Sequence, residues 1–143
     1  MHISSLLSEK GSSVVTITAD ATVAEAVDEL EKHRIGAIVV SGDGTHIDGI
    51  LSERDVVRAL GHIGAELLDR PVRTIMTAVV VTASPDDEVD SLMATMTDHR
   101  VRHVPIVTDG TLRGIVSIGD VVKSRIGELE KDRKELVEYI NAR

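Results

Sequence analysis

The sequence predicts an α+β fold made of two pseudo-symmetric β-α-β-β-α units that pack through their sheets, followed by a C-terminal amphipathic helix. Two observations predict it: a motif that occurs twice, and hydrophobic spacings that change in the same order in both copies. The chain has 143 residues, of which 42% are hydrophobic and 28% are charged, so a packed core is expected. This length suits one ordinary domain or two very small ones.

A nine-residue segment is repeated in the chain. Residues 49–57 read GILSERDVV and residues 114–122 read GIVSIGDVV, with six of nine positions identical at an offset of 65. Upstream, residues 33–35 align with residues 99–101 at an offset of 66, and the one-residue difference falls in a Gly/Asp-rich loop. We therefore predict a first unit at 8–60, a connector at 61–78, a second unit at 79–126 and a C-terminal helix at 127–143.

Each copy has three predicted strands. The first is a β-branched run, at residues 14–18 in the first copy and 79–82 in the second. The other two flank a Gly/Asp turn and form a hairpin, predicted at 36–40 with 47–51 and at 104–107 with 112–116. The first run of each hairpin is continuously apolar, which is typical of a strand that is buried on both faces.

Each copy also has two predicted helices. The first has apolar residues at helical spacing, begins at a cap provided by Thr22 or Asp20 in the first copy, and begins near Ser84 in the second. The second helix closes each copy and begins near Ser52 or Ser117. A single unit of about 50 residues buries little apolar surface, so we expect the units to pack sheet against sheet around a pseudo-two-fold axis.

The C-terminal segment, residues 127–143, differs from the repeats. Leu129, Leu136 and Ile140 lie on one side at helical spacing. We expect an exposed amphipathic helix that packs on a partner or on its own domain, and we favour a second copy of the chain as the partner.

Composition and charge exclude several classes of function. Cysteine is absent, which excludes disulfides, thiolate metal sites and a cysteine nucleophile. The net charge of −8 argues against binding to nucleic acid phosphates. No apolar run approaches the roughly 18 residues that cross a bilayer. We therefore expect a cytoplasmic protein with no catalytic residues, no metal site, and no nucleic-acid or membrane partner.

Two Ser-x-x-Asp pairs, Ser52 with Asp55 and Ser117 with Asp120, open the closing helices. One interpretation is structural, because this spacing forms a capping box that satisfies backbone N–H groups at a helix start. The other is functional, because a carboxylate in the first turn of a helix can accept two hydrogen bonds from the vicinal hydroxyls of a ribose. The sequence pattern fits both interpretations.

A cationic cluster contrasts with the negative charge of the chain; it contains His99, Arg100, Arg102 and His103. Exposed strand residues that pair with nearby acids such as Asp98 would explain it. An anion site would explain it too, because guanidinium groups match the geometry of phosphate and are always charged.

The first copy has small residues, Gly36 and Ala37, where the second copy has Arg102 and His103. Small residues let a flat base approach backbone N–H and C=O groups, which can read the edge of an adenine. Under pseudo-two-fold symmetry the two strands lie close together. The basic segment of one copy can therefore reach a ligand that is held mainly by the other copy.

Together these features resemble a tandem pair of cystathionine-β-synthase (CBS) domains, known as a Bateman module. The resemblance rests on the β-α-β-β-α unit, the closings at 49–55 and 114–120, and HRVRHVP at 99–105, and it covers about residues 8–125. It implies a regulatory sensor without catalytic activity that binds an adenosine nucleotide between the copies: AMP first, then ATP or ADP, with NAD and S-adenosylmethionine as further candidates. It also implies a homodimer of modules and an effector protein that the module regulates.

The resemblance also implies two clefts. Asp55 and Asp120 would hold ribose hydroxyls, each assisted by the serine three residues before it, and Arg100 and Arg102 would contact phosphate. The residues expected in one base pocket are Thr16, Thr18, Ile35, Gly36 and Ala37. Those expected in the other are Thr82, Ser84, Val101, Arg102 and His103, while Ser52 and Ser117 would assist at the ribose.

Two other functions remain as alternatives. An interaction or oligomerisation scaffold that binds no nucleotide would need only the capping boxes and the C-terminal helix. A small hydrolase or transferase is supported only by the presence of His, Arg and Asp residues.

Overall fold

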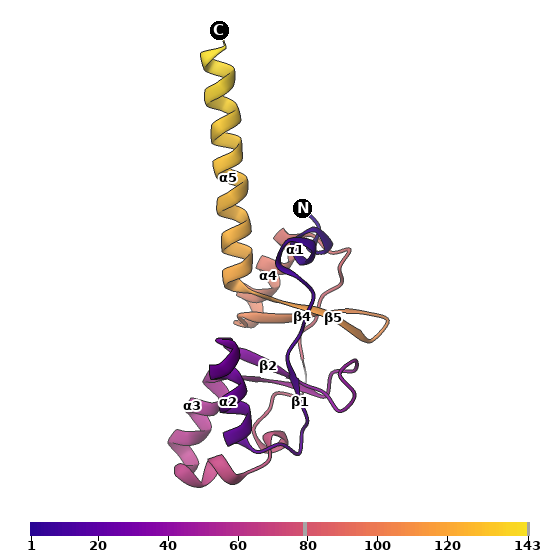
Figure 1. Ribbon diagram of the computed structural model, residues 1–143, viewed down its shortest axis with the longest axis vertical. Coiled ribbons are helices and arrows are strands. Elements are labelled where there is room, and N and C mark those ends of the chain that lie inside the picture. The colour runs from indigo at the N-terminus through magenta and orange to yellow at the C-terminus, as the bar shows by residue number, and fades with distance from the viewer. Residues whose placement is uncertain (79, 143) are drawn as a thin grey trace.

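The computed structural model describes residues 1–78 and 80–142. Two units lie one above the other with their small sheets facing, and a long C-terminal helix extends away from them (Figure 1). Each unit has its own cluster of buried aliphatic side chains. The predicted fold, two β-α-β-β-α units with a C-terminal helix, is confirmed.

The first unit follows the prediction closely. Its elements are β1 (Thr16–Ile17), α2 (Val23–His33), β2 (Ala37–Val40), β3 (Gly49–Ser52) and α3 (Glu53–Ile63). β2 is the central strand, parallel to β1 and antiparallel to β3, with Ala37 opposite Ser52. All four residues of β2 are buried, as the continuous apolar run predicts. Thr22, not Asp20, caps α2: its hydroxyl accepts a hydrogen bond from the N–H of Glu25.

The second unit departs from the prediction at its start. Its elements are α4 (Val89–His99), β4 (His103–Thr108), β5 (Thr111–Ser117) and α5 (Ile118–Asn141). The strand predicted at 79–82 is wrong: Val79 lies outside the described residues, and residues 80–82 form no strand. Pairing at this position is reduced to one parallel bridge between Ala83 and Ile106, so β-branched residues alone did not make a strand.

The helix predicted to begin near Ser84 begins later, at Val89. The intervening residues close a turn in which Asp87 accepts a hydrogen bond from the N–H of Ser84, and the hydroxyl of Ser84 accepts one from the N–H of Asp86. Ser84 therefore starts a turn before the helix and not the helix itself.

The predicted C-terminal helix is not separate from the closing helix of the second unit. Both belong to α5, which continues through Gly127 and ends at Asn141; Arg143 lies outside the described residues. One glycine weakens a helix by about 1 kcal/mol without necessarily ending it. The distal half of α5 leaves the two units (Figure 1), and the side chain of Leu129 is 61% exposed.

The structure adds a helix that the repeat did not predict, α1 (Ile3–Lys10). Its apolar residues Ile3, Leu6 and Leu7 are buried in the core of the second unit. Residues 8–10, which were predicted to open the first unit, therefore lie in a helix that covers the second.

The connector covers the core of the first unit, as α1 covers the core of the second. It contains two short 3-10 helices, η1 (Ala65–Asp69) and η2 (Val72–Thr74), and Val72 is buried in the first core. Backbone bridges repeat this symmetry, because His2 pairs with Glu88 and Pro71 pairs with Thr22. Each unit is thus covered by the segment that precedes the other unit.

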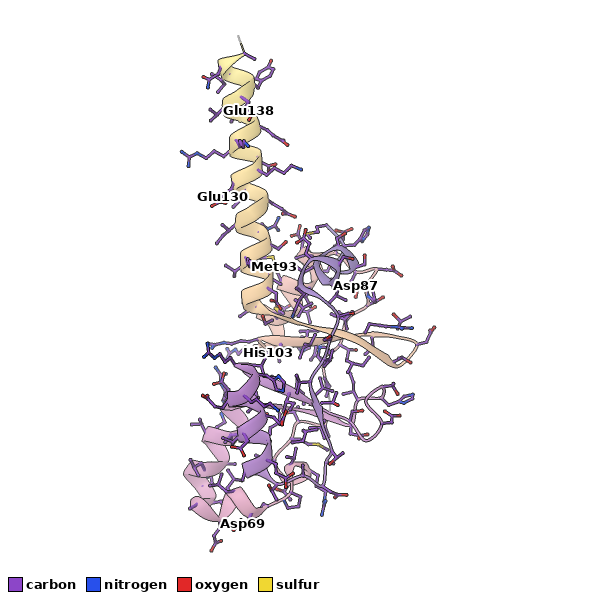
Figure 2. The ribbon with its side chains drawn as sticks, viewed as in Figure 1. Asp69, Asp87, Met93, His103, Glu130 and Glu138 are labelled. Atoms are coloured by element: carbon purple, nitrogen blue, oxygen red, sulfur yellow. The ribbon has the colours of Figure 1, made fainter. Side chains whose placement is uncertain are left out.

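The two units meet where β2 and β4 begin, and Figure 2 shows His103 at this junction. A Cβ added to Gly36 would lie 2.6 Å from Oε1 of Glu53 and 3.1 Å from Cε1 of His103, so the absence of a side chain at Gly36 makes room for both. Burial lowers the pKa of the partly buried His103 imidazole below its ordinary 6.5, although Glu53 and Asp120 oppose the shift.

Ile3→Ala is expected to lower the free energy of unfolding by about 2–5 kcal/mol, because it leaves a cavity where α1 packs on the second core. Leu129→Ala, on the exposed part of α5, is the control and should change it by less than about 0.5 kcal/mol. Urea unfolding followed by circular dichroism measures both. Equal and small effects would show that α1 is not docked.

The stability of the fold should decrease on acidification through His103. Its folded pKa lies below 6.5, so near that pH the unfolded chain binds more protons, and the free energy of unfolding falls as the pH drops through 6.5 towards the folded pKa. Urea unfolding at about pH 8 and about pH 5 should show a smaller decrease in His103→Gln than in the wild type. The same decrease in both proteins would show that His103 does not cause the loss of stability at low pH.

Candidate functional site

A cleft of about 290 Å³ lies between the two units. Eight of the residues predicted from the sequence line it: Gly36, Ala37, Ser52 and Asp55 from the first unit, and Arg100, Val101, Arg102 and His103 from the second. Residues that the sequence places 45 or more positions apart therefore contribute to one space. Neither unit alone supplies both the carboxylate and the adjacent cationic segment.

Two carboxylate residues line the cleft, Glu53 and Asp55, both in the first turn of α3. The structural interpretation of the Ser-x-x-Asp pair holds here: the hydroxyl of Ser52 accepts a hydrogen bond from the N–H of Asp55 at 3.2 Å, and Oδ2 of Asp55 accepts one from the N–H of Ser52 at 2.9 Å. No described group donates a hydrogen bond to Oδ1 of Asp55. The cap therefore leaves acceptor capacity on a carboxylate that lines the cleft.

Four arginines are among the residues that line the same cleft: Arg54 and Arg58 of α3, and Arg100 and Arg102 just before β4. Within residues 1–78 and 80–142, none of the four forms an ion pair or a side-chain hydrogen bond. Arg54 and Arg58 are separated by one helical turn, which brings them to one face of α3. Arg58 was missed from the sequence, although its i,i+4 spacing from Arg54 and its position after Asp55 could have indicated it.

The small residues lie at the start of β2. The carbonyl of Gly36 accepts a hydrogen bond from the N–H of Glu53, and Ala37 pairs with Ser52. Val80, Val81 and Val101 add aliphatic side chains to the lining. The cleft thus combines an apolar wall, accessible backbone and cationic groups.

The second Ser-x-x-Asp pair has different surroundings. It forms the same capping box, but Oδ2 of Asp120 also accepts a hydrogen bond from Nζ of Lys10 at 2.6 Å. Burial acts to raise the pKa of Asp120, yet the hydrogen bonds from Lys10 and Ser117 outweigh it and hold the pKa below 3.8. Asp120 lines a groove between α1 and α5, not the cleft between the units.

The remaining predicted residues do not join the lining of the cleft as the described residues form it. Thr16 is in β1, Ile35 packs against the first core, and Thr82 and Ser84 precede α4. Thr18 follows β1. Val101, Arg102 and His103 line the cleft with Asp55. Arg102 and His103 also lie beside the second Ser-x-x-Asp pair, because His103 pairs with Ser117 and the carbonyl of Arg102 accepts a hydrogen bond from the N–H of Ile118. The binding roles of all these residues stay predictions.

Neither a metal-binding cluster nor a membrane-spanning helix occurs among the described residues. No three His, Asp or Glu side chains there are grouped so that they could hold a metal ion. No helix there combines the length and the apolar character needed to span a membrane.

Comparison with known proteins identifies the family. The family model of the CBS domain matches residues 8–62 and 72–127. A curated relative, the mitochondrial CBS domain-containing protein CBSX3 of Arabidopsis thaliana, is 36% identical over 146 residues, which covers 96% of this chain and 71% of the relative.

Solved structures share the fold. The CBS-domain containing protein ATU1752 of Agrobacterium tumefaciens has a TM-score of 0.84 at 44% identity, over 87% of this chain and 99% of that one. The CBS domain protein PAE2072 of Pyrobaculum aerophilum, complexed with AMP, has a TM-score of 0.75 at 32% identity, over 84% and 89%. The CBS domain pair of protein MJ0100, in complex with 5-methylthioadenosine and S-adenosyl-L-methionine, has a TM-score of 0.79 at 25% identity, over 90% and 98%. With a family match in each repeat and these shared folds, the chain belongs to the CBS domain family and contains two copies of the domain.

Proposed function

We propose that the chain is a regulatory module without catalytic activity that binds an adenosine nucleotide in the cleft between its two CBS domains. The observation that carries this proposal is the meeting of the capping carboxylate Asp55, which has spare acceptor capacity, with four arginines whose guanidinium groups no described residue pairs and which outnumber the two carboxylates of the cleft, Glu53 and Asp55. A ribose phosphate presents the complementary groups, because its vicinal hydroxyls donate hydrogen bonds and its phosphate accepts them.

The charge of the cleft favours a phosphate ligand. The neighbours' ligands include AMP in one complex and S-adenosyl-L-methionine in another. S-adenosylmethionine carries a sulfonium cation, which the guanidinium groups of Arg100 and Arg102 would repel, whereas the phosphate of AMP would be attracted. The charge therefore supports AMP, ADP or ATP over S-adenosylmethionine.

The size of the cleft favours a small nucleotide. Its volume of about 290 Å³ is at the low end of the roughly 300–1,000 Å³ that small-molecule sites span. AMP is therefore the first candidate, ahead of ADP or ATP and of the larger dinucleotide NAD. Its adenine would meet the backbone at Gly36 and Ala37 and the aliphatic wall, in place of aromatic stacking.

Assembly is a second part of the proposal. Ile126, Leu129, Leu136 and Ile140 follow one another on α5 at spacings of three, seven and four residues, and each is more than half exposed. This spacing is typical of the contact face of paired helices. We propose that a second copy of the chain covers this face, and that the dimer presents the nucleotide-bound state to an effector protein. The same face is what favours the alternative function, a scaffold that binds no nucleotide.

Asp55→Asn is expected to weaken AMP binding by about tenfold or more, because it removes the charge from the hydrogen bonds to ribose while an amide oxygen can still cap α3. Isothermal titration calorimetry of the full chain measures the affinity, and adenosine should bind more weakly than AMP. The control is Asp69→Asn, at the far end of the first unit (Figure 2), which should bind as the wild type does. No heat with AMP, ADP, ATP or NAD at millimolar concentration would contradict nucleotide binding.

The double variant Leu129→Glu with Leu136→Glu is expected to be monomeric, because charges would be buried at the paired face. Light scattering coupled to size exclusion gives the mass, which should be half that of the wild type. AMP affinity should persist, since neither residue lines the cleft. Lys134→Gln on the same helix is the control, and a monomeric wild type would refute the dimer.

A further inference from the structure

We infer that Lys10 turns the second carboxylate, Asp120, into an anchor for α1, so that the module holds one nucleotide per chain, at Asp55. The inference deepens the proposed function and depends on it for the identity of the ligand only. It is carried by the contacts of Asp120, which differ from those of Asp55 although both residues occupy the same place in the same motif.

Lys10 makes two short contacts at the start of α5. Its ammonium donates hydrogen bonds to Oδ2 of Asp120 and to the carbonyl of Ile115, both at 2.6 Å. The side chains of Lys10 and Asp120 are 29% and 25% exposed, and no other ion pair among the described residues has both side chains so well covered. Water and salt therefore screen this pair less than the others.

The two carboxylates differ in how many lone pairs remain free to accept a hydrogen bond from a ligand. Oδ2 of Asp120 accepts from Lys10 and from the N–H of Ser117, which together use both lone pairs of that oxygen. Within residues 1–78 and 80–142, Oδ2 of Asp55 accepts a hydrogen bond only from the N–H of Ser52. A ribose that donates one hydroxyl to each oxygen can bind at Asp55, but at Asp120 it would first have to displace a charged ammonium group with a neutral hydroxyl.

The packing of α1 holds Lys10 in this position. Leu7, one turn earlier, lies so close to Gly114 that a Cβ there would be 2.7 Å from its Cδ2. Ile3 and Leu6 are buried in the same core. Lys10 is in the last turn of a docked helix, so its ammonium is presented to Asp120 by the fold and not by a mobile segment.

The sequence explains why the first unit lacks such an anchor. The segment before the second unit aligns with α1 at an offset of 69, which places Ile3 with Val72 and Lys10 with Val79. The aligned position in the sequence therefore holds no lysine.

The number of ligands per chain tests the inference directly. In calorimetric titration with AMP, the wild type should bind one equivalent, Asp55→Asn should weaken its binding by about tenfold or more, and Asp120→Asn should keep it with an affinity within about threefold of the wild type. Two equivalents in the wild type, or loss of AMP binding in Asp120→Asn, would overturn the inference.

Hydrogen exchange tests the anchor without any ligand. Lys10→Met should raise the exchange rates of amides in α1 by about tenfold, Asp120→Asn should do the same, and the double variant should add little, because both changes break one contact. Lys123→Met removes another lysine of the same groove and should leave these rates unchanged.

The proposed nucleotide binding and the anchoring of α1 by Lys10 and Asp120 can be refuted independently. A wild type that binds no AMP would refute the proposed function, and the exchange rates would then decide the inference alone. Additive effects of Lys10→Met and Asp120→Asn, or no effect of either, would overturn it whatever the titration shows.

Discussion

The close contact of the two units at Gly36 is the constraint on which the rest of the structure depends. Because Gly36 has no side chain, Glu53 and His103 occupy the space beside it, and the start of β4 lies against the start of β2. This contact brings the basic segment of the second unit next to the first turn of α3. The cleft is therefore a property of the pair of units, and a single unit could not form it.

The two Ser-x-x-Asp motifs show that a repeated sequence does not repeat a site. Both cap a helix in the same way, with backbone and side chain exchanging two hydrogen bonds. They differ in what else reaches the carboxylate: Asp55 lines a cleft with four guanidinium groups, whereas Asp120 meets Lys10 of α1. The difference comes from segments outside the motif, which the internal symmetry leaves free to diverge.

The sequence predicted the fold well where local spacing and duplication agree, as in β2, α2 and the two closing helices. It failed at residues 79–82, because β-branched residues favour a strand only when a partner strand is in reach. It missed α1 because the helix lies outside the nine-residue repeat, although the spacing of Ile3, Leu6 and Leu7 recurs before the second unit. The contact of Lys10 with Asp120 spans 110 positions, so no local pattern could indicate it.

The structural and functional interpretations of Asp55 support each other. A capping carboxylate lies at the positive end of the helix dipole, where an acidic side chain stabilises the helix. The hydrogen bond from the N–H of Ser52 fixes one oxygen, so the side chain loses little further freedom when a ligand arrives. The cap uses one acceptor position and orients the others. A residue can thus serve the helix and the ligand at once, provided that no cation such as Lys10 occupies the position beside it.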